Sequence, residues 1–175
     1  MFSARDLTDL RAGPAIRAGG WKDGSVRQMI AEHRLCLGQH GVADSRHRRY
    51  GIADVARLIL LETLYRRIGL KAQQAVDMVN ASWTHLSILG EAELLAISSG
   101  EPSRGTRWHL VYMPTREGPV EPEWLSPEQM HELDGGHGRI VEVRIDLRAI
   151  TREARNRLVT ELGFSLSGLS HDFAK

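Results

Sequence analysis

The sequence lacks the features that mark secreted, membrane-spanning and disordered proteins. Its one cysteine, Cys36, excludes an internal disulfide framework and suggests a reducing compartment. No apolar run approaches the roughly 18–20 residues that a membrane span requires, and MFSARDLTDL at the N-terminus has no apolar signal region. No repeat or low-complexity tract occurs. With 42% hydrophobic and 26% charged residues among 175, we expect a globular protein of a bacterial-type cytoplasm.

The chain as a whole also lacks a large excess of positive or negative charge, although the net charges of its two halves differ. The formal net charge is +1. Residues 1–80 hold 13 basic and 8 acidic side chains, whereas residues 81–175 hold 10 and 14. Net charges of +5 and −4 suggest a basic unit that binds a polyanion, followed by an acidic unit with another role. We therefore expect two domains, 1–82 and 83–175.

The first half carries the local signals of four helices and one irregular segment. Ser3 is an N-cap for the first expected helix, which Gly13-Pro14 ends before the loop AIRAGGW. Val26, Met29 and Ile30 have the i, i+3, i+4 spacing of a second helix. The stretch after it contains two glycines and has no helical period. The expected elements are helices at 4–12, 25–34, 53–68 and 72–79, and a β-hairpin or extended loop at 35–50.

The second half has the patterns of a small α+β unit. The segment IVEVRIDL alternates apolar and charged residues, as a strand with one buried face does. Further along, Ile150, Ala154, Leu158 and Leu162 share one face of a helix. The expected elements are three short strands at 94–98, 108–113 and 140–147, a proline-rich loop at 114–138, and an amphipathic helix at 150–162. The expected fold class is α+β.

Two polar clusters in the first half suit contact with nucleic acid. Helix 25–34 presents Arg27 and Gln28 away from its apolar face, and such side chains form bidentate hydrogen bonds with guanine and adenine edges. The run RHRR at 46–49 follows in the irregular segment, where cations would contact phosphates or a minor groove. A charge run alone is usually a solvated loop. Its position after a short polar-faced helix favours DNA contact.

The segment RRYGIADVARLILLETLYRRIGLKAQQAVDMV resembles the part of MerR-type winged helix-turn-helix regulators that follows the wing. The matching positions are Arg48, Arg49, Tyr50, Asp54, Leu58, Ile59, Leu64, Ile68, Gly69, Leu70, Ala75 and Val76. SVRQMIAEHRL is similar to the recognition helix of that family, with Arg27 where an arginine commonly contacts DNA. Met29 and Ile30 replace the usual paired tyrosines, and the long dimerisation helix is not expected after residue 80.

This resemblance, over about residues 5–80, implies a winged helix-turn-helix followed by an α+β dimerisation or effector region. It implies a sequence-specific transcriptional regulator with helix 25–34 in the major groove and the wing 35–50 on the flanking backbone or minor groove. One module reads few base pairs, so we expect a homodimer on double-stranded DNA. The expected DNA contacts are Arg27, Gln28 and His33 on the helix, Arg46, His47, Arg48 and Arg49 in the wing, and Arg17, Lys22 and Arg34 on nearby phosphates.

Two alternatives stay open, and the remaining reactive residues indicate structure more than chemistry. The protein could be an adaptor that binds RNA polymerase or another regulator, or an excisionase-like factor that shapes DNA. HELDGGHG (131–138) lacks a compact metal-ligand spacing, and Cys36 has no oriented base, so no enzyme activity, cofactor or metal is expected. Asp54 is expected to be an ordinary carboxylate at a helix N-terminus. We expect the protein core, rather than an effector pocket, to contain the aromatic residues Trp83, Trp108, Tyr112 and Trp124.

Overall fold

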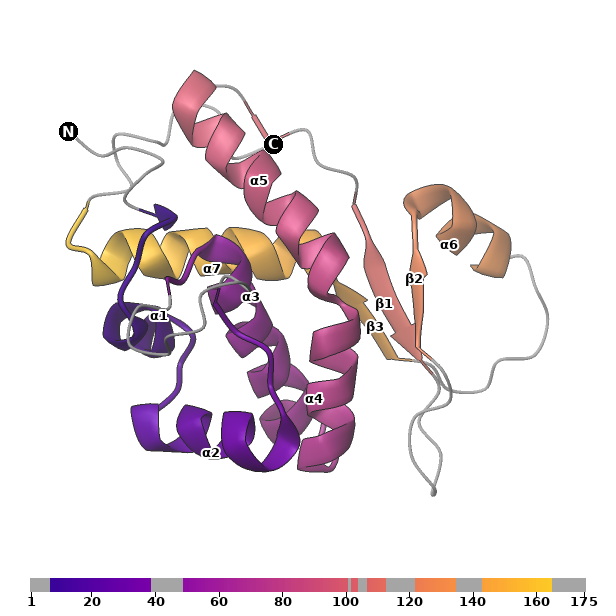
Figure 1. Cartoon of the computed structure of the whole chain (residues 1–175). Coiled ribbons are helices and arrows are strands. Elements are labelled where there is room, and N and C mark those ends of the chain that lie inside the picture. The colour runs from indigo at the N-terminus through magenta and orange to yellow at the C-terminus, as the bar shows by residue number, and fades with distance from the viewer. Residues whose placement is uncertain are drawn as a thin grey trace.

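The computed structural model of the chain describes residues 7–38, 49–100, 102–103, 107–112, 122–134 and 143–164. Within them the fold is mostly helical α+β: helices between residues 12 and 99 precede a three-stranded antiparallel sheet and a C-terminal helix (Figure 1). No described helix is long and apolar enough to cross a membrane. The elements are α1 (Ala12–Ala18), α2 (Asp23–His33), α3 (Ile52–Leu61), the π-helix η3 (Glu62–Arg67), α4 (Ala72–Ala81), α5 (Trp83–Ser99), β1 (His109–Tyr112), β2 (Glu123–Leu125), α6 (Pro127–Asp134), β3 (Val143–Asp146) and α7 (Leu147–Glu161).

Helix α3 occupies the centre of the molecule. Every residue from Ile52 to Leu61 except Ala53 is buried, including the ion-paired Asp54 and Arg57. The helix packs against α1, α4, α5 and α7, and α7 passes behind it in Figure 1. The apolar core includes residues from Leu7 to Leu158. It therefore crosses the expected boundary between residues 82 and 83.

A buried ion pair joins α5 to α7. Glu93 is 1% exposed, and its Oε2 accepts a hydrogen bond of 2.8 Å from Nη1 of Arg155. Nε of Arg152 lies 4.0 Å from the other carboxylate oxygen. Burial of a charge costs free energy unless a partner compensates it, so Glu93 favours the placement of α7 that brings Arg155 beside it.

The sheet lies to one side of the helices, with strand order β2-β1-β3 (Figure 1). Leu110 in the central strand is paired with Trp124 on one side and Ile145 on the other. Leu110 is fully buried and Ile145 is 7% exposed, so this face of β1 and β3 joins the helical core. Because β3 runs directly into α7, the sheet fixes the position at which the C-terminal helix begins.

Aromatic contacts attach the sheet to the start of α5. The ring of His85 stacks on Trp124 with centroids 5.6 Å apart and meets Trp108 edge-on at 4.8 Å. Trp124 also donates from Nε1 to the buried Ser82 hydroxyl at 3.0 Å. Nδ1 of His85 is buried and has no partner among the described residues. Burial lowers the pKa of His85, because a charged imidazolium would lose its hydration there.

The predicted helix at 4–12 is wrong for the part that the structure describes. Residues 7–11 are not α-helical, and α1 runs instead through the Gly13-Pro14 pair that was expected to end a helix. Both residues lie in the first turn of α1. Backbone N–H groups in a first turn have no helical partner, so proline loses nothing there. The expected loop AIRAGGW consequently supplies the rest of the helix.

The predicted strand at 94–98 is also wrong, because these residues belong to α5. A helix of 17 residues, α5, thus follows shortly after residue 80. A strand forms at β2 and a helix at α6, inside the region 114–138 that was expected to be loop. The helices at 25–34, 53–68, 72–79 and 150–162 and the strand at 108–113 are confirmed with shifted ends. The strand expected over 140–147 is confirmed at Val143–Asp146 and ends before Leu147, which already belongs to α7, whereas residues 140–142 lie outside the described part of the chain.

The environment of His85 predicts a loss of stability in acid. Its pKa is lowered in the folded state, so below the ordinary histidine pKa of about 6.5 the unfolded chain binds this proton more readily than the folded chain does. The free energy of unfolding should therefore fall as the pH drops below that value. The substitution His85→Phe, which keeps a ring between Trp108 and Trp124, should reduce this fall. Urea unfolding of both proteins at pH 7.5 and pH 5.5 measures the difference, and identical pH dependence would contradict the prediction.

Candidate nucleic-acid interface

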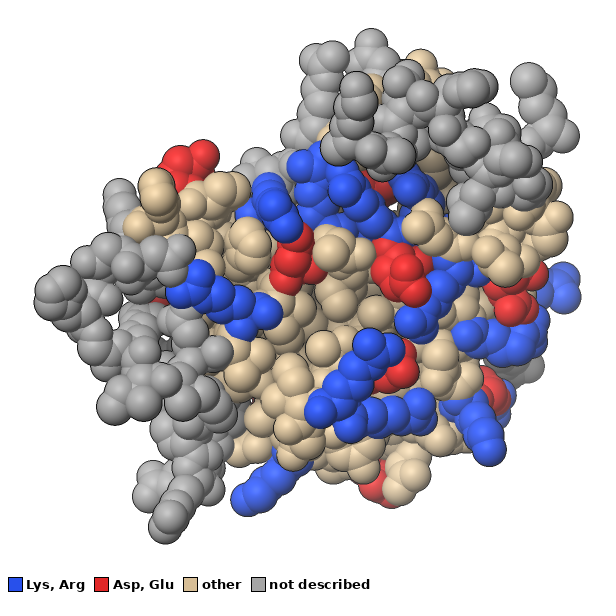
Figure 2. Space-filling view, turned by 180° about the vertical axis from the view of Figure 1, so that it is seen from behind, with Lys and Arg blue, Asp and Glu red and all other residues tan. Residues whose placement is uncertain are grey.

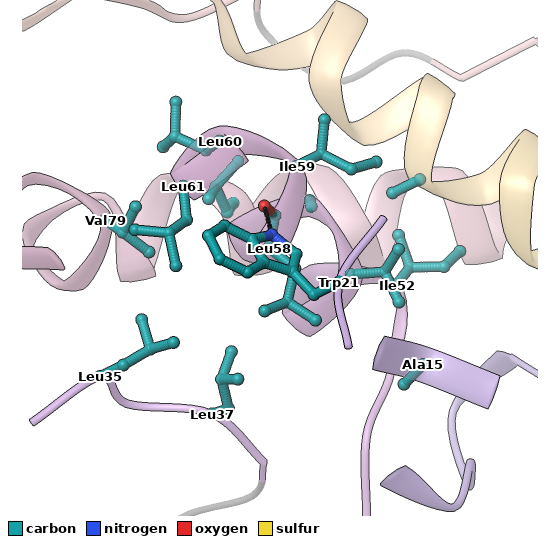
Figure 3. Packing of buried hydrophobic residues seen from close by; sticks show 14 of the residues in the cluster. Ala15, Trp21, Leu35, Leu37, Ile52, Leu58, Ile59, Leu60, Leu61 and Val79 are labelled. Carbon is teal, nitrogen blue, oxygen red and sulfur yellow. Dashed lines mark hydrogen bonds between the residues drawn. The ribbon is translucent and has the colours of Figure 1, made fainter. Parts of the chain in front are cut away.

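A four-residue turn, Gly19 to Lys22, joins α1 to α2 and is fixed against α3. A Cβ atom at Gly19 would lie 2.5 Å from Cβ of Leu58, so the close approach of the turn to α3 requires glycine. Gly20 has φ of +78°, in the left-handed region that glycine adopts without strain. Trp21 inserts its indole beside α3 and donates from Nε1 to the carbonyl of Leu58 at 2.9 Å (Figure 3). The angle between the two helices is thus set by contacts with the core.

Helix α2 has a buried face and an exposed face. Val26 and Met29 are buried, and the apolar Leu35 and Leu37 that follow the helix lie in the same core (Figure 3). Arg27 and Gln28 are exposed, with 77% of the Arg27 side chain accessible. The structure therefore places these two expected base-reading residues side by side on the outward face.

Both outward residues interact with acids of their own helix. Nη2 of Arg27 lies 2.8 Å from Oδ2 of Asp23, and Nε2 of Gln28 donates to the carboxylate of Glu32 at 3.1 and 3.2 Å. These contacts are exposed and join residues one helical turn apart, so each contributes little to the free energy of unfolding. To contact a base edge, Arg27 would have to leave Asp23, and Gln28 would have to leave Glu32.

The C-terminal end of α2 is held by α4. Nδ1 of His33 shares a hydrogen bond of 3.1 Å with Oε1 of Gln73. Arg34 is exposed and adopts φ of 59°, which is costly for a residue other than glycine. Asn80 stabilises this conformation with two hydrogen bonds. Its Nδ2 donates to the Arg34 carbonyl at 3.1 Å, and its Oδ1 accepts from the backbone N–H of the half-buried Cys36 at 2.9 Å. The backbone that leaves α2 therefore has a defined direction.

The other expected contact residues are not all gathered on one surface. Lys22 is exposed at the start of α2. Nε of Arg17 lies 2.7 Å from Oε1 of Glu161 at the end of α7, so this arginine is paired with an acid of α7. Nε of Arg49 lies 3.1 Å from Asp9. Arg46, His47 and Arg48, with most of the expected wing, lie outside the described residues.

The face seen from behind, over α7, mixes basic and acidic side chains (Figure 2). Arg157 illustrates the pattern, because its Nη1 lies 3.5 Å from Glu62 and its Nε lies 2.8 Å from Glu153. Such a surface has no sustained field of one sign and does not favour a polyanion. Among the expected contacts with described side chains, those on and beside α2 remain the candidate interface.

One carboxylate holds both ends of the segment that follows α2. Oδ1 of Asp54 accepts from the backbone N–H of Gly38 at 2.9 Å, and Oδ2 accepts from that of Gly51 at 3.0 Å. Tyr50 adds an antiparallel bridge with Leu10, through backbone hydrogen bonds of 3.0 and 3.1 Å. The chain between residues 38 and 51 thus departs from and returns to a fixed base beside α1 and α3.

A buried arginine completes this base. Nη1 of Arg57 donates to Oδ1 of Asp54 at 2.8 Å, and its guanidinium lies 3.0 Å from the ring centroid of Trp83. Arg57 is 1% exposed. Burial lowers the pKa of Arg57 to about 10 although the Asp54 carboxylate raises it, so the guanidinium remains charged at neutral pH. The Asp54 charge is compensated inside the protein.

Comparison of the chain with protein families, with curated proteins and with solved structures finds no match. Sequence reasoning recognised Asp54 as a helix N-terminal carboxylate, which its bond to Gly51 bears out, but missed its bond to Gly38. The spacing Gly51-x-x-Asp54 signals the first contact. Nothing in the local sequence signals the second contact or the role of Asn80, because both join residues far apart in the chain.

Removal of the Asp54 carboxylate should strongly destabilise the protein. Asp54→Ala leaves Arg57 buried without its anion and two backbone N–H groups without acceptors, and such a loss costs about 3–5 kcal/mol. Asp9→Ala is a matched control: it also removes an aspartate from an arginine pair, but the Asp9 and Arg49 side chains are 64% and 48% exposed, and the expected cost is under about 1 kcal/mol. Urea unfolding followed by circular dichroism measures both. Equal losses in the two variants would show that Asp54 does not have this role.

Proposed function

We propose that the protein is a sequence-specific DNA-binding transcriptional regulator with a winged helix-turn-helix of the MerR-like kind. The observation that carries the proposal is the pairing of α1 and α2 across a four-residue turn that rests on α3, with Arg27 and Gln28 outward on α2. In helix-turn-helix proteins the second helix of such a pair enters the major groove. Here α2 is the recognition helix, and it packs against α1 and α4.

The fixed base of the 38–51 segment supports the second part of the proposal. In a winged module the chain leaves the recognition helix, contacts the DNA backbone or minor groove, and returns beside the first helix. The contacts of Asp54 with Gly38 and Gly51, and the bridge of Leu10 with Tyr50, provide such a point of departure and return. The basic run RHRR at 46–49 lies in this segment. Its cations would contact phosphates and so position α2 in the groove.

Exposed apolar residues on α5 support the homodimer. Ile88 is 51% exposed and Leu95 is 69% exposed, and their spacing of seven residues places them on the same side of the helix. Large apolar side chains aligned on one helix face are typical of an interface. A dimer joined there would present two copies of α2 to two half-sites, which gives the specificity that one module lacks.

DNA binding should depend strongly on salt and on Arg27. On a duplex selected from random sequences, the logarithm of the affinity should fall with the logarithm of salt concentration, with a slope of about −0.9 for each phosphate contact. Arg27→Ala should cost about 1–3 kcal/mol on the selected site and relax preference at one base. Arg48→Ala should weaken selected and unselected duplexes alike. Fluorescence anisotropy measures all three effects.

The matched control for Arg27→Ala is Arg107→Ala. Arg107 is also an exposed arginine paired with an aspartate, Asp146, but it lies beside β1, well away from α2 in Figure 1. This variant should bind the selected duplex like the wild type. Salt-independent affinity, or equal losses in the two variants, would contradict the proposal and favour an adaptor whose basic charge is incidental.

The dimer interface is tested by placing charge on the apolar face of α5. The double substitution Ile88→Glu with Leu95→Glu should convert a dimer to a monomer, because two carboxylates would be buried against their symmetry copies. Ala31→Glu adds charge to the exposed side of α2 and should leave the dimer intact. Light scattering of the purified proteins reports the mass. A monomeric wild type at working concentration would contradict the proposed dimer.

A further inference from the structure

The outward face of α2 is a stripe of exposed residues with a net negative charge. Three exposed pairs follow one another at intervals of about one helical turn: Asp23 and Gly24, Arg27 and Gln28, and Ala31 and Glu32. Two carboxylates and one guanidinium give the stripe a formal charge of −1. A face that bound DNA only by general attraction to phosphates would be basic instead. The acids of this stripe suit discrimination between sequences better than general affinity.

The first turn of the stripe suits close approach to another surface. A Cβ atom placed at Gly24 would meet nothing within 4 Å. Neither packing nor a positive φ thus requires glycine at this position, although glycine weakens a helix. The missing side chain allows the backbone of this turn to lie near a base edge. Asp23, the neighbour of Gly24 in the same turn, would then lie near the base edges as well.

Asp23 loses its partner when Arg27 binds a base. Its Oδ2 lies 2.8 Å from Nη2 of Arg27, and its side chain is 49% exposed. Within the described part of the chain, Arg27 is the one cation that pairs with this carboxylate. When Arg27 moves to a guanine, the negative charge of Asp23 stays behind next to a polyanion. That arrangement costs free energy unless the carboxylate accepts a hydrogen bond from the DNA.

Few groups in the major groove can donate to a carboxylate. The donors there are the exocyclic amino groups of cytosine and adenine. Adenine carries the acceptor N7 next to its amino group, and N7 would repel a carboxylate, whereas cytosine presents the donor alone. The four-residue spacing of Asp23 and Arg27 corresponds to about 6 Å along the helix, or roughly two base pairs of about 3.4 Å. A cytosine close to the guanine is therefore the partner that fits Asp23.

We propose that Asp23 is a specificity-determining residue, whose carboxylate accepts from N4 of a cytosine within about two base pairs of the guanine that Arg27 contacts. The inference rests on the proposed DNA-binding function and deepens it. On the correct sequence, the ion pair of the free protein is exchanged for two contacts with bases. On a sequence without the cytosine, the carboxylate has no donor, so Asp23 rejects that sequence.

The test compares single base-pair changes in the duplex selected from random sequences. Replacement of the cytosine–guanine pair by thymine–adenine puts the acceptor O4 in place of the N4 donor. The full-length wild type should bind this duplex about tenfold more weakly than the selected one. Asp23→Ala should lose less than about twofold for the same change, but should keep the wild-type loss when the guanine of Arg27 is replaced. Fluorescence anisotropy measures each affinity.

Affinity for unselected DNA gives a second readout that a merely structural residue would not produce. Asp23→Ala removes a negative charge from the groove, so it should bind an unselected duplex roughly twofold or more tightly than the wild type does. Glu153→Ala is the matched control. Glu153 is 48% exposed and also pairs with an arginine one turn away, Nε of Arg157 at 2.8 Å, but it lies on α7. This variant has the same change in net charge and should keep both the affinities and the cytosine preference of the wild type.

The outcomes separate this inference from the proposed function. A selected sequence without cytosine within about two base pairs of the guanine would overturn the role of Asp23, as would a cytosine preference that survives in Asp23→Ala. Equal weakening of Asp23→Ala on all duplexes would also overturn it, because that result indicates a carboxylate that only stabilises the start of α2. Each of these results leaves the proposed function standing. A wild type that binds no duplex would overturn the proposed function and this inference together.

Discussion

The Asp54 carboxylate is the constraint on which the arrangement of the first half depends. It accepts hydrogen bonds from Gly38 and Gly51, which lie thirteen positions apart in the sequence, and is compensated by the buried Arg57. Without this anion the backbone N–H groups of Gly38 and Gly51 would lose their acceptor at the N-terminal end of α3. Its charge is also what allows a guanidinium to be buried beside Trp83 at the start of α5. A single side chain therefore links α2, α3 and α5.

Helix α3 transmits this constraint through the rest of the molecule. Its carbonyl at Leu58 accepts from Trp21, so the turn before α2 is fixed to the same helix as the Asp54 site. Its opposite side packs on α7, which is itself held to α5 by the ion pair of Arg155 with Glu93. Changes in the acidic half of the sequence are therefore able to reach α2 through packed contacts.

The parts that could be predicted from the sequence are those with one exposed side. The periodicity of Val26 and Met29 identified α2 and showed that Arg27 faces outward. The five apolar-rich residues LLAIS gave no such signal, because apolar side chains lie on the exposed face of α5 as well as on its buried face, and a short apolar run fits a buried strand equally well. Gly13-Pro14 is read as a helix terminator, although both residues suit a first turn. Contacts such as Asn80 with Arg34 join distant residues and cannot be read from a local pattern.

The attachment of both Gly38 and Gly51 to one carboxylate has a consequence for how the sequence of such a protein can evolve. The segment between these glycines begins and ends at the same carboxylate, so its length can change without moving the two attachment points, provided that Tyr50 keeps its bridge with Leu10. The entropy of closing a chain between two fixed points grows slowly, by only about 0.6 kcal/mol for each doubling of length. Insertions, deletions and new charges can accumulate there while α2 and α3 keep their geometry. Under the proposed function, the DNA contacts of this segment can therefore change while its attachment to Asp54 is kept.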